Sequence, residues 1–309
     1  MKKSEIVKFF LERKVFLSPE VLDFLYQNQD EIKKALQIVD QGVKVLTLEA
    51  LKQKQDTRDV EIIIEEYNKI NEVTIDKIKE CLRKRFDFLS SILRRKPELK
   101  NTISINKIKN NKEFSLIGIV KEKEEGRIII EDKTGHVGIF IPKKYYESVY
   151  IDEVVGVRCY QEEKNIFAKS IIKPDIPVFR KNPKTERSII LTSDRVILSG
   201  EEKPIKWSKI ARIELDGFFV VFLDKMVVKK YGEINTNTVL KLLKGRNLNP
   251  TIIYRDCFYE KDPYLLDKIP DLIIVPYQNL ETRNYKGTTI VLLPEGYGID
   301  LSRRKAIKL

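Results

Sequence analysis

Histidine and cysteine, which most often ligate transition metals in enzymes, are scarce in this chain of 309 residues. The sole histidine is His136. Hydrolytic two-metal sites combine several imidazole and carboxylate ligands at fixed spacing, and one imidazole cannot supply such a set. The three cysteines, Cys81, Cys159 and Cys257, lie too far apart for a CxxC zinc motif and give no reason to expect a disulfide framework. We therefore expect a protein that binds other molecules rather than one that cleaves them.

Residues 121–144 carry several basic side chains and one phenylalanine, Phe140, which makes this segment a candidate for binding single-stranded nucleic acid. Single-stranded nucleic acid binds basic grooves that also present aromatic side chains. The candidates for contact with DNA are Lys121, Arg127, Lys133, Lys143 and Lys144, with Lys123 and Phe140 beside them. Acidic residues are interleaved with this set, namely Glu122, Glu124, Glu125, Glu131 and Asp132. Two interpretations of this segment therefore stay open: a surface that binds single-stranded nucleic acid, or a surface that docks on a partner protein. His136 is expected at the surface.

The overall charge favours a polyanionic partner. Lysine and arginine outnumber aspartate and glutamate by 58 to 46, for a net charge of +12. Many lysine-rich proteins carry such an excess without binding nucleic acid. Between Lys77 and Lys100, nine basic residues stand against three acidic ones, which indicates either a solvated helix face or a contact for phosphates. No apolar run approaches the roughly 20 residues that cross a bilayer, and the N-terminus does not have the pattern of a signal peptide, so we expect an intracellular protein without a membrane partner.

The first quarter of the chain is expected to form a small helical domain and a linker. Apolar residues recur at helical spacing through residues 1–53, and Ser18-Pro19-Glu20 is typical of a helix start. Residues 54–74 are predicted to hold a linker and a strand rich in isoleucine. Thr74 is expected to cap a long helix that ends near Pro97.

A β-barrel is predicted after this helix, within a domain of residues 75–175. The expected strands cover residues 114–120, 127–130, 137–141, 154–159 and 166–171, with a short helix beginning at Pro142. Three strands, a helix and two further strands are the order of an OB fold. Residues 176–186 form a connector.

Residues 187–309 are predicted to be an α/β domain. Apolar strand-like runs cover residues 188–191, 218–223, 251–254, 272–275 and 288–293, and a helix is expected over residues 235–243. Trp207 lies in a segment with alternating apolar positions, so we expect it to pack on a strand face, or else to be an exposed contact for a partner.

Several strings in fixed order resemble the small subunit of archaeal family D DNA polymerases. The strings are Asp59-Val60-Glu61-Ile62-Ile63, Arg85-Phe86, Ile92-Leu93-Arg94, Gly118-Ile119-Val120, Glu131-Asp132-Lys133-Thr134-Gly135, Asp152-Glu153-Val154-Val155-Gly156-Val157 and Pro174-Asp175-Ile176-Pro177. The resemblance covers roughly residues 59–180. It implies an α+β multidomain protein with a small helical N-terminal domain, an OB-fold barrel and a C-terminal calcineurin-like phosphoesterase domain.

The positions that would ligate metals in such a domain have changed. The family's first strand ends in Asp-x-His, whereas this chain has Asp194-Arg195-Val196, so Asp194 is a vestigial ligand position. The family's Gly-Asp and Gly-Asn-His motifs are missing from residues 187–309, and Pro276-Tyr277-Gln278-Asn279 stands where Gly-His-x-His is expected. Other carboxylates, Asp216, Asp224 and Asp271, are scattered. The resemblance therefore implies a degenerate, shortened phosphoesterase domain with no catalytic residue, no bound metal and no cofactor.

The function implied is that of a non-catalytic accessory subunit in DNA replication. Its expected partners are the large catalytic subunit, DNA through the complex, and other replication factors through the helical N-terminal domain. Its expected location is the cytoplasm, in association with the nucleoid. Two alternatives stay open: an active 3'-5' exonuclease whose metal site is rebuilt from carboxylates such as Asp194 and Asp271, and a free-standing OB-type protein that binds single-stranded DNA.

Overall fold

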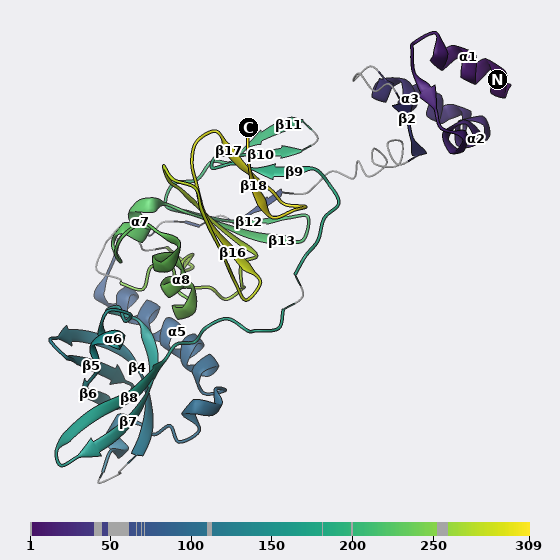
Figure 1. The fold of residues 1–309 in the computed structure, drawn as a ribbon. Helices are drawn as coiled ribbons and strands as arrows, with labels where there is room; N and C mark the ends of the chain where they lie inside the picture. Colours follow the sequence, from purple (N-terminus) through teal and green to yellow (C-terminus); the bar gives the residue numbers. More distant parts are fainter. Residues whose placement is uncertain are drawn as a thin grey trace. The chain divides into compact units, whose positions relative to one another are not determined.

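The structure is a computed structural model that describes residues 2–39, 45–48, 62–65, 67–68, 70, 72–109, 113–180, 182–198, 200–251 and 259–309. The chain divides into two compact units, Met1–Glu61 and Ile62–Leu309, which are described separately (Figure 1). Cys257 and most of the strand predicted at residues 251–254 lie outside the described residues. None of the described helices is both long enough and apolar enough to span a bilayer.

The described residues of the N-terminal unit form three α-helices and one short strand pair, in keeping with the helical domain expected there. Its elements are α1 (Lys3–Leu11), β1 (Phe16–Leu17), α2 (Pro19–Gln27), η1 (Gln29–Glu31), α3 (Ile32–Val39) and β2 (Val45–Leu46). Ser18 caps α2 as its sequence indicates, because its hydroxyl accepts a hydrogen bond from the Val21 amide at 3.4 Å. The core is small and centres on Ile6, Phe10 and Leu25.

A long helix and a closed five-stranded barrel follow the first strand of the second unit. Helix α5 (Ile75–Leu93) starts at the predicted cap, Thr74, whose hydroxyl accepts from the Lys77 amide at 3.3 Å. Two short 3-10 helices follow, η2 (Pro97–Leu99) and η3 (Ile105–Lys107). The barrel elements are β4 (Glu113–Glu124), β5 (Arg127–Asp132), β6 (Gly135–Phe140), α6 (Lys143–Tyr146), β7 (Val154–Glu162) and β8 (Asn165–Ile172).

The barrel closes in the spatial order β4-β5-β6-β8-β7. Along the chain, α6 lies between β6 and β7, as predicted. Strand β4 pairs with β5 along one part and with β7 along the other, and it carries a bulge between Val120 and Glu122. A bulge bends a strand, which allows a single strand to pair with both neighbours. At the end of the barrel, Leu99 packs so closely on Gly156 that a Cβ there would lie 2.4 Å from the leucine Cδ1.

Two sheets form the remainder of this unit. The six-stranded sheet has the order β15-β16-β14-β13-β12-β3, and the five-stranded sheet has the order β11-β10-β9-β17-β18. Their strands are β3 (Ile62–Ile64), β9 (Ile189–Leu191), β10 (Arg195–Leu198), β11 (Glu201–Pro204), β12 (Ile210–Leu215), β13 (Phe218–Leu223), β14 (Leu272–Pro276), β15 (Glu281–Tyr285), β16 (Thr288–Leu293), β17 (Tyr297–Asp300) and β18 (Lys305–Lys308). The predicted strand before the barrel, β3, pairs antiparallel with β12, which follows the barrel.

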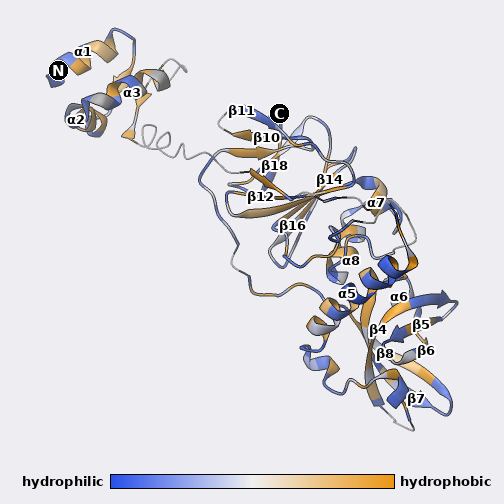
Figure 2. Ribbon diagram, turned by 180° about the vertical axis from the view of Figure 1, so that it is seen from behind, coloured by the Kyte–Doolittle hydropathy of each residue, from blue (hydrophilic) through white to orange (hydrophobic). Residues whose placement is uncertain are grey.

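Strand β13 is buried on both faces, and different layers cover them. Phe219, Val221 and Leu223 share a core with α8 (Thr236–Gly245) and α7 (Lys225–Lys229). On the other face, Phe222 contacts Trp207 at 5.7 Å between ring centroids, and Phe218 lies under Arg304 of the β17–β18 connection. Figures 1 and 2 show the helices and the five-stranded sheet on opposite sides of this central sheet. The apolar run Phe218–Leu223, predicted as a buried strand, therefore lies at the centre of these layers. The two sheets with α7 and α8 are called the layered part below.

Trp207 packs as predicted, although its own segment is not a strand. The residues between β11 and β12 are irregular, and the Trp207 indole donates to the Ser193 carbonyl at 2.9 Å. The segment crosses from one sheet to the other, and the Trp207 ring packs on Phe222 of β13.

Buried charged groups join helix α5 and the barrel to the layered part. Arg85 of α5 is 2% exposed, and its guanidinium contacts Asp262 at 2.5 Å and donates to the Pro250 carbonyl at 2.6 Å. Burial alone would lower the pKa of Arg85, but Asp262 offsets this and raises the pKa above its ordinary value. Glu153 at the start of the β7 region, also 2% exposed, pairs with Lys173 at 2.6 Å. The Glu153 carboxylate fills the space beside Gly245 of α8, where a Cβ would lie 2.6 Å from its oxygen.

Replacing Arg85 with alanine should lower the free energy of unfolding by about 3–5 kcal/mol, because Asp262 would stay nearly buried without its partner. Urea unfolding followed by circular dichroism measures this change. The matched control is Arg83→Ala on an exposed position of the same helix, for which we expect a change within about 0.5 kcal/mol. Equal effects of the two substitutions would contradict the role assigned to Arg85.

Candidate functional site

A surface pocket of about 770 Å³ lies where three parallel strands of the central sheet end. Strands β13, β14 and β16 pair in parallel, and the residues directly after each of them line the pocket. The lining residues that follow these strands are Asp224, Lys225, Tyr277, Gln278, Glu295 and Tyr297. In open α/β sheets, ligands bind beyond the carboxyl ends of the strands, so this is the candidate site of the layered part.

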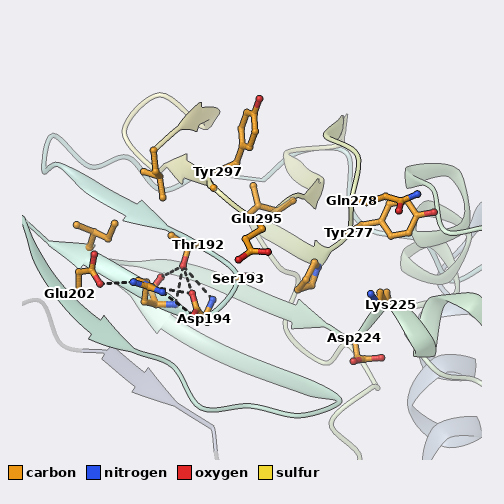
Figure 3. Close-up of a pocket in the computed structure, with 16 residues that line it drawn as sticks. Thr192, Ser193, Asp194, Glu202, Asp224, Lys225, Tyr277, Gln278, Glu295 and Tyr297 are labelled. Atoms are coloured by element: carbon orange, nitrogen blue, oxygen red, sulfur yellow. Dashed lines mark hydrogen bonds and ion pairs between the residues drawn. The ribbon is translucent and has the colours of Figure 1, made fainter.

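Asp194, the predicted vestigial ligand, lines one side of this pocket in the turn between β9 and β10 (Figure 3). Its carboxylate accepts hydrogen bonds from the Thr192 hydroxyl at 2.9 Å and from Arg195 Nε at 3.1 Å. Arg195 also pairs with Glu202 at 2.7 Å. The hydrogen bond from Arg195 holds the pKa of Asp194 below its ordinary value. This carboxylate is thus part of a surface ion-pair network rather than an unpaired ligand.

Val196, which stands where the family has a histidine, is fully buried. It lies in β10 opposite Leu191 of β9 and belongs to the core between the sheets. Tyr277, which stands at the first histidine position of Gly-His-x-His, instead lines the pocket on the side opposite Asp194 (Figure 3). The structure therefore brings the retained Asp194 and one altered ligand position, Tyr277, to one pocket and places another, Val196, in the core.

The other carboxylates noted in the sequence have structural partners. Asp224 lines the pocket and caps α7, where it accepts from the Met226 amide at 2.7 Å. Asp216 lies in the β12–β13 turn and pairs with Arg187 at 3.6 Å. Asp271 is buried, pairs with Arg180 at 2.6 Å and accepts from the Phe219 amide at 2.9 Å.

Asp194 and Asp271 do not lie at one site. Asp271 precedes the five-residue strand β14, whereas the pocket lies beyond its end, about 16 Å away at about 3.3 Å per residue. Within the described part of the chain, no three His, Cys, Asp or Glu side chains form a group that could hold a metal ion.

The five basic residues predicted to contact DNA lie on different barrel elements, and three of them are paired. Lys121 of β4 pairs with Glu131 at 3.0 Å, Arg127 of β5 with Glu124 at 3.6 Å, and Lys133 with Asp87 of α5 at 2.6 Å. Lys143 and Lys144 are exposed on α6. These two lysines are therefore the better candidates for a phosphate contact.

Lys123 and His136 differ in how they are placed. The Lys123 ammonium donates to the carbonyls of Tyr146 and Val149 at 2.8 and 2.7 Å, and burial lowers its pKa. It therefore holds the chain after α6 rather than facing a ligand. His136 is exposed in β6 opposite Glu131, as expected for the surface.

An aromatic ladder crosses three barrel strands, and the sequence indicated only one of its members. Phe140 stacks on Phe167 at 5.3 Å between centroids, and Phe167 stacks on Tyr160 at 5.3 Å. The guanidinium of Arg127 lies 5.8 Å from the outer ring, that of Phe140. The rings stack on one another across the strands, which stabilises the barrel, while Phe140 at the outer end is 38% exposed. The pairing of β6 with β8, which brings Phe167 beside Phe140, is not visible in the sequence.

The fold and the site define a mixed α/β protein in which a five-stranded barrel is joined to layered sheets with a pocket at their strand ends. No family model matches the chain. The chain is homologous to small subunits of archaeal family D DNA polymerases over about two fifths of its length. It is 34% identical over 142 residues to the DNA polymerase II small subunit of Pyrococcus abyssi, with 41% of this chain and 23% of the relative covered. The corresponding subunit of Methanothermobacter thermautotrophicus is 30% identical over 105 residues, covering 30% and 22%.

The chain spans about a quarter of the length of the curated relatives it matches. Among solved structures, the hypothetical protein ygiW from E. coli is 17% identical and covers 23% of this chain and 84% of its own, with a TM-score of 0.19.

Introducing the missing imidazole should not create a metal site. Val196→His places a polar ring in the core, and we expect it to lower the free energy of unfolding by about 1–3 kcal/mol. Thermal unfolding with and without manganese measures both properties, and we expect no metal-dependent stabilisation. A manganese-dependent rise in the unfolding temperature of this variant would contradict the buried placement.

Glutamine at both Lys143 and Lys144 should weaken the salt dependence of any affinity for single-stranded DNA. Removing two phosphate contacts reduces the slope of log K against log salt by about 1.4. Titration of a fluorescent oligonucleotide at several salt concentrations measures the slope. The matched control replaces the paired residues Lys121 and Lys133, and an equal effect there would count against a specific role of α6.

Proposed function

We propose that this protein is a non-catalytic accessory subunit of an archaeal replicative family D DNA polymerase and that it binds the large catalytic subunit. The observation that carries the proposal is the homology to small subunits of such polymerases over about two fifths of the chain. The C-terminal part is, in this proposal, a calcineurin-like phosphoesterase domain that has lost its ligands, and the barrel is an OB fold.

The non-catalytic part of the proposal is supported by the altered ligand positions. Val196 belongs to the core, Tyr277 carries a phenol in place of an imidazole, and the Asp194 carboxylate is engaged by Arg195. Asp271, the second carboxylate of a rebuilt site, is used to hold Arg180 and the Phe219 amide. An exonuclease built on these residues would need to break the buried contacts of Asp271.

A role in assembly is supported by the buried contacts between the barrel and the sheets. Arg85 and Glu153 are each about 2% exposed; Arg85 of α5 pairs with Asp262 of the layered part, and the Glu153 carboxylate beside the barrel packs against Gly245 of α8. Two parts fixed in this way offer a rigid surface to a partner, which lowers the entropy lost on binding. We further propose that DNA is contacted through the complex, that the N-terminal unit binds other replication factors, and that the protein acts in the cytoplasm at the nucleoid.

Mixing with the large subunit of the same organism should stabilise this chain. At a large-subunit concentration of 100 times Kd, binding adds about 2.7 kcal/mol to the free energy of unfolding. Differential scanning fluorimetry and co-elution on size-exclusion chromatography measure the effect. Separate elution with an unchanged unfolding temperature would contradict the proposal.

A nuclease assay separates this proposal from the exonuclease alternative. Labelled single-stranded and mismatched DNA is incubated with manganese and either the natural chain or Asp194→Ala, and we expect no cleavage by either. Cleavage by the natural chain that is lost in Asp194→Ala would establish an active site instead.

A further inference from the structure

An apolar dipeptide on the connector between β8 and β9 is exposed to an unusual degree. Phe179 is 95% exposed and Val178 is 62% exposed, whereas Ile176, three residues earlier, is 3% exposed and belongs to the core. Single exposed apolar residues are ordinary on protein surfaces. A nearly fully exposed phenylalanine beside an exposed valine is a different case, and Figure 2 shows this connector as extended chain with an apolar stretch.

The connector is held firmly just before this dipeptide. Asp175 has a φ of +55°, and its carboxylate accepts from the Tyr285 hydroxyl at 2.9 Å and pairs with Lys286 at 2.5 Å. Its amide donates to the Lys244 carbonyl at 2.7 Å, and Lys286 also donates to the Ile176 carbonyl at 3.1 Å. The chain thus reaches Pro177 from a fixed point on the sheet.

The connector is held again immediately after the dipeptide. The guanidinium of Arg180 donates to the carbonyls of Ile269 and Pro270 at 2.9 Å each, and to the Gly287 carbonyl at 3.0 Å. It also pairs with Asp271 at 2.6 Å. Only Pro177, Val178 and Phe179 lie between the two fixed points, and the proline ring restricts one more backbone angle.

Such a rigid display lowers the cost of binding. Ordering a mobile loop or side chain at an interface costs free energy, and a segment already held in one conformation avoids most of that cost. Buried aromatic anchors contribute most of the binding free energy at many protein interfaces. An exposed ring that is held between two fixed points has the properties of such an anchor.

We propose that Val178 and Phe179 form the anchor by which this chain binds the large polymerase subunit, through an apolar pocket with acidic residues at its rim. This inference rests on the proposed function and names the surface that carries it. The acidic rim follows from charge: the chain carries +12, and Lys184, five residues from Phe179, is exposed. A pocket of about 980 Å³ lined by Asn182, Pro183 and Lys184 adjoins the anchor and can receive side chains of the partner.

A protein fits this surface better than a nucleic acid. Single strands bind several aromatic faces in succession, with free cations for the phosphates. Here one ring stands beside an aliphatic residue, and the guanidinium next to it, that of Arg180, is engaged by Asp271.

The test compares Phe179→Ala with the natural full-length chain in binding to the purified large subunit by biolayer interferometry. We expect the Kd to rise at least about 30-fold, as for an interface hot spot. The unfolding temperature of the isolated variant should stay within about 2 °C, because the ring makes no core contact. Ile75→Ala removes another strongly exposed apolar side chain, 71% exposed on α5, and should change the Kd less than about twofold.

Each outcome separates the inference from the proposed function. Failure of the natural chain to bind the large subunit overturns both. Binding by the natural chain with an equal Kd for Phe179→Ala overturns the inference and leaves the proposed function standing. Weaker binding of a single-stranded oligonucleotide by Phe179→Ala, with unchanged binding of the large subunit, also overturns it and assigns the surface to nucleic acid.

Discussion

The buried guanidinium of Arg85 is the contact on which the arrangement of the second unit depends. It projects from α5, whose apolar face packs on the barrel through Phe86, Leu89 and Leu93, and it ends on Asp262 and the Pro250 carbonyl of the layered part. A charge at this depth is tolerated only when its partners are in place, so the helix, barrel and sheets are held in one geometry. Glu153 and Lys173 add a second buried pair beside α8.

The pocket at the strand ends has the position of a ligand site, but its side chains differ from those of a two-metal site. Carboxyl ends of parallel strands converge there because the strands share one direction, whatever residues follow them. Asp194 and Gln278 lie on opposite sides of it, while the charge of Asp194 is satisfied by Arg195. Surface ion pairs of this kind contribute little to stability, but they occupy lone pairs that a metal ion would need.

Local features of the sequence were reliable guides. Thr74 and Ser18 cap helices where they were expected, and the barrel strands and α6 follow the predicted order, because caps and apolar alternation act over a few residues. Trp207 packs on a strand face as expected, although its own segment is irregular because it crosses between two sheets. Among the candidate DNA contacts, pairing of Lys121 and Lys133 with acidic residues on other elements was not foreseeable.

The sequence by itself determined the barrel strands, the caps of α2 and α5 and the absence of the imidazoles that a two-metal site requires, since these depend on residue type and short-range spacing. Only the tertiary structure decided that β3 pairs with β12, a strand roughly 150 residues later in the chain. It also decided that Val196 is enclosed in the core and that the Phe179 side chain is exposed to solvent. These properties depend on contacts between residues far apart in the chain. Such contacts are set by how whole faces of sheets and helices pack, and no short window of sequence contains that information.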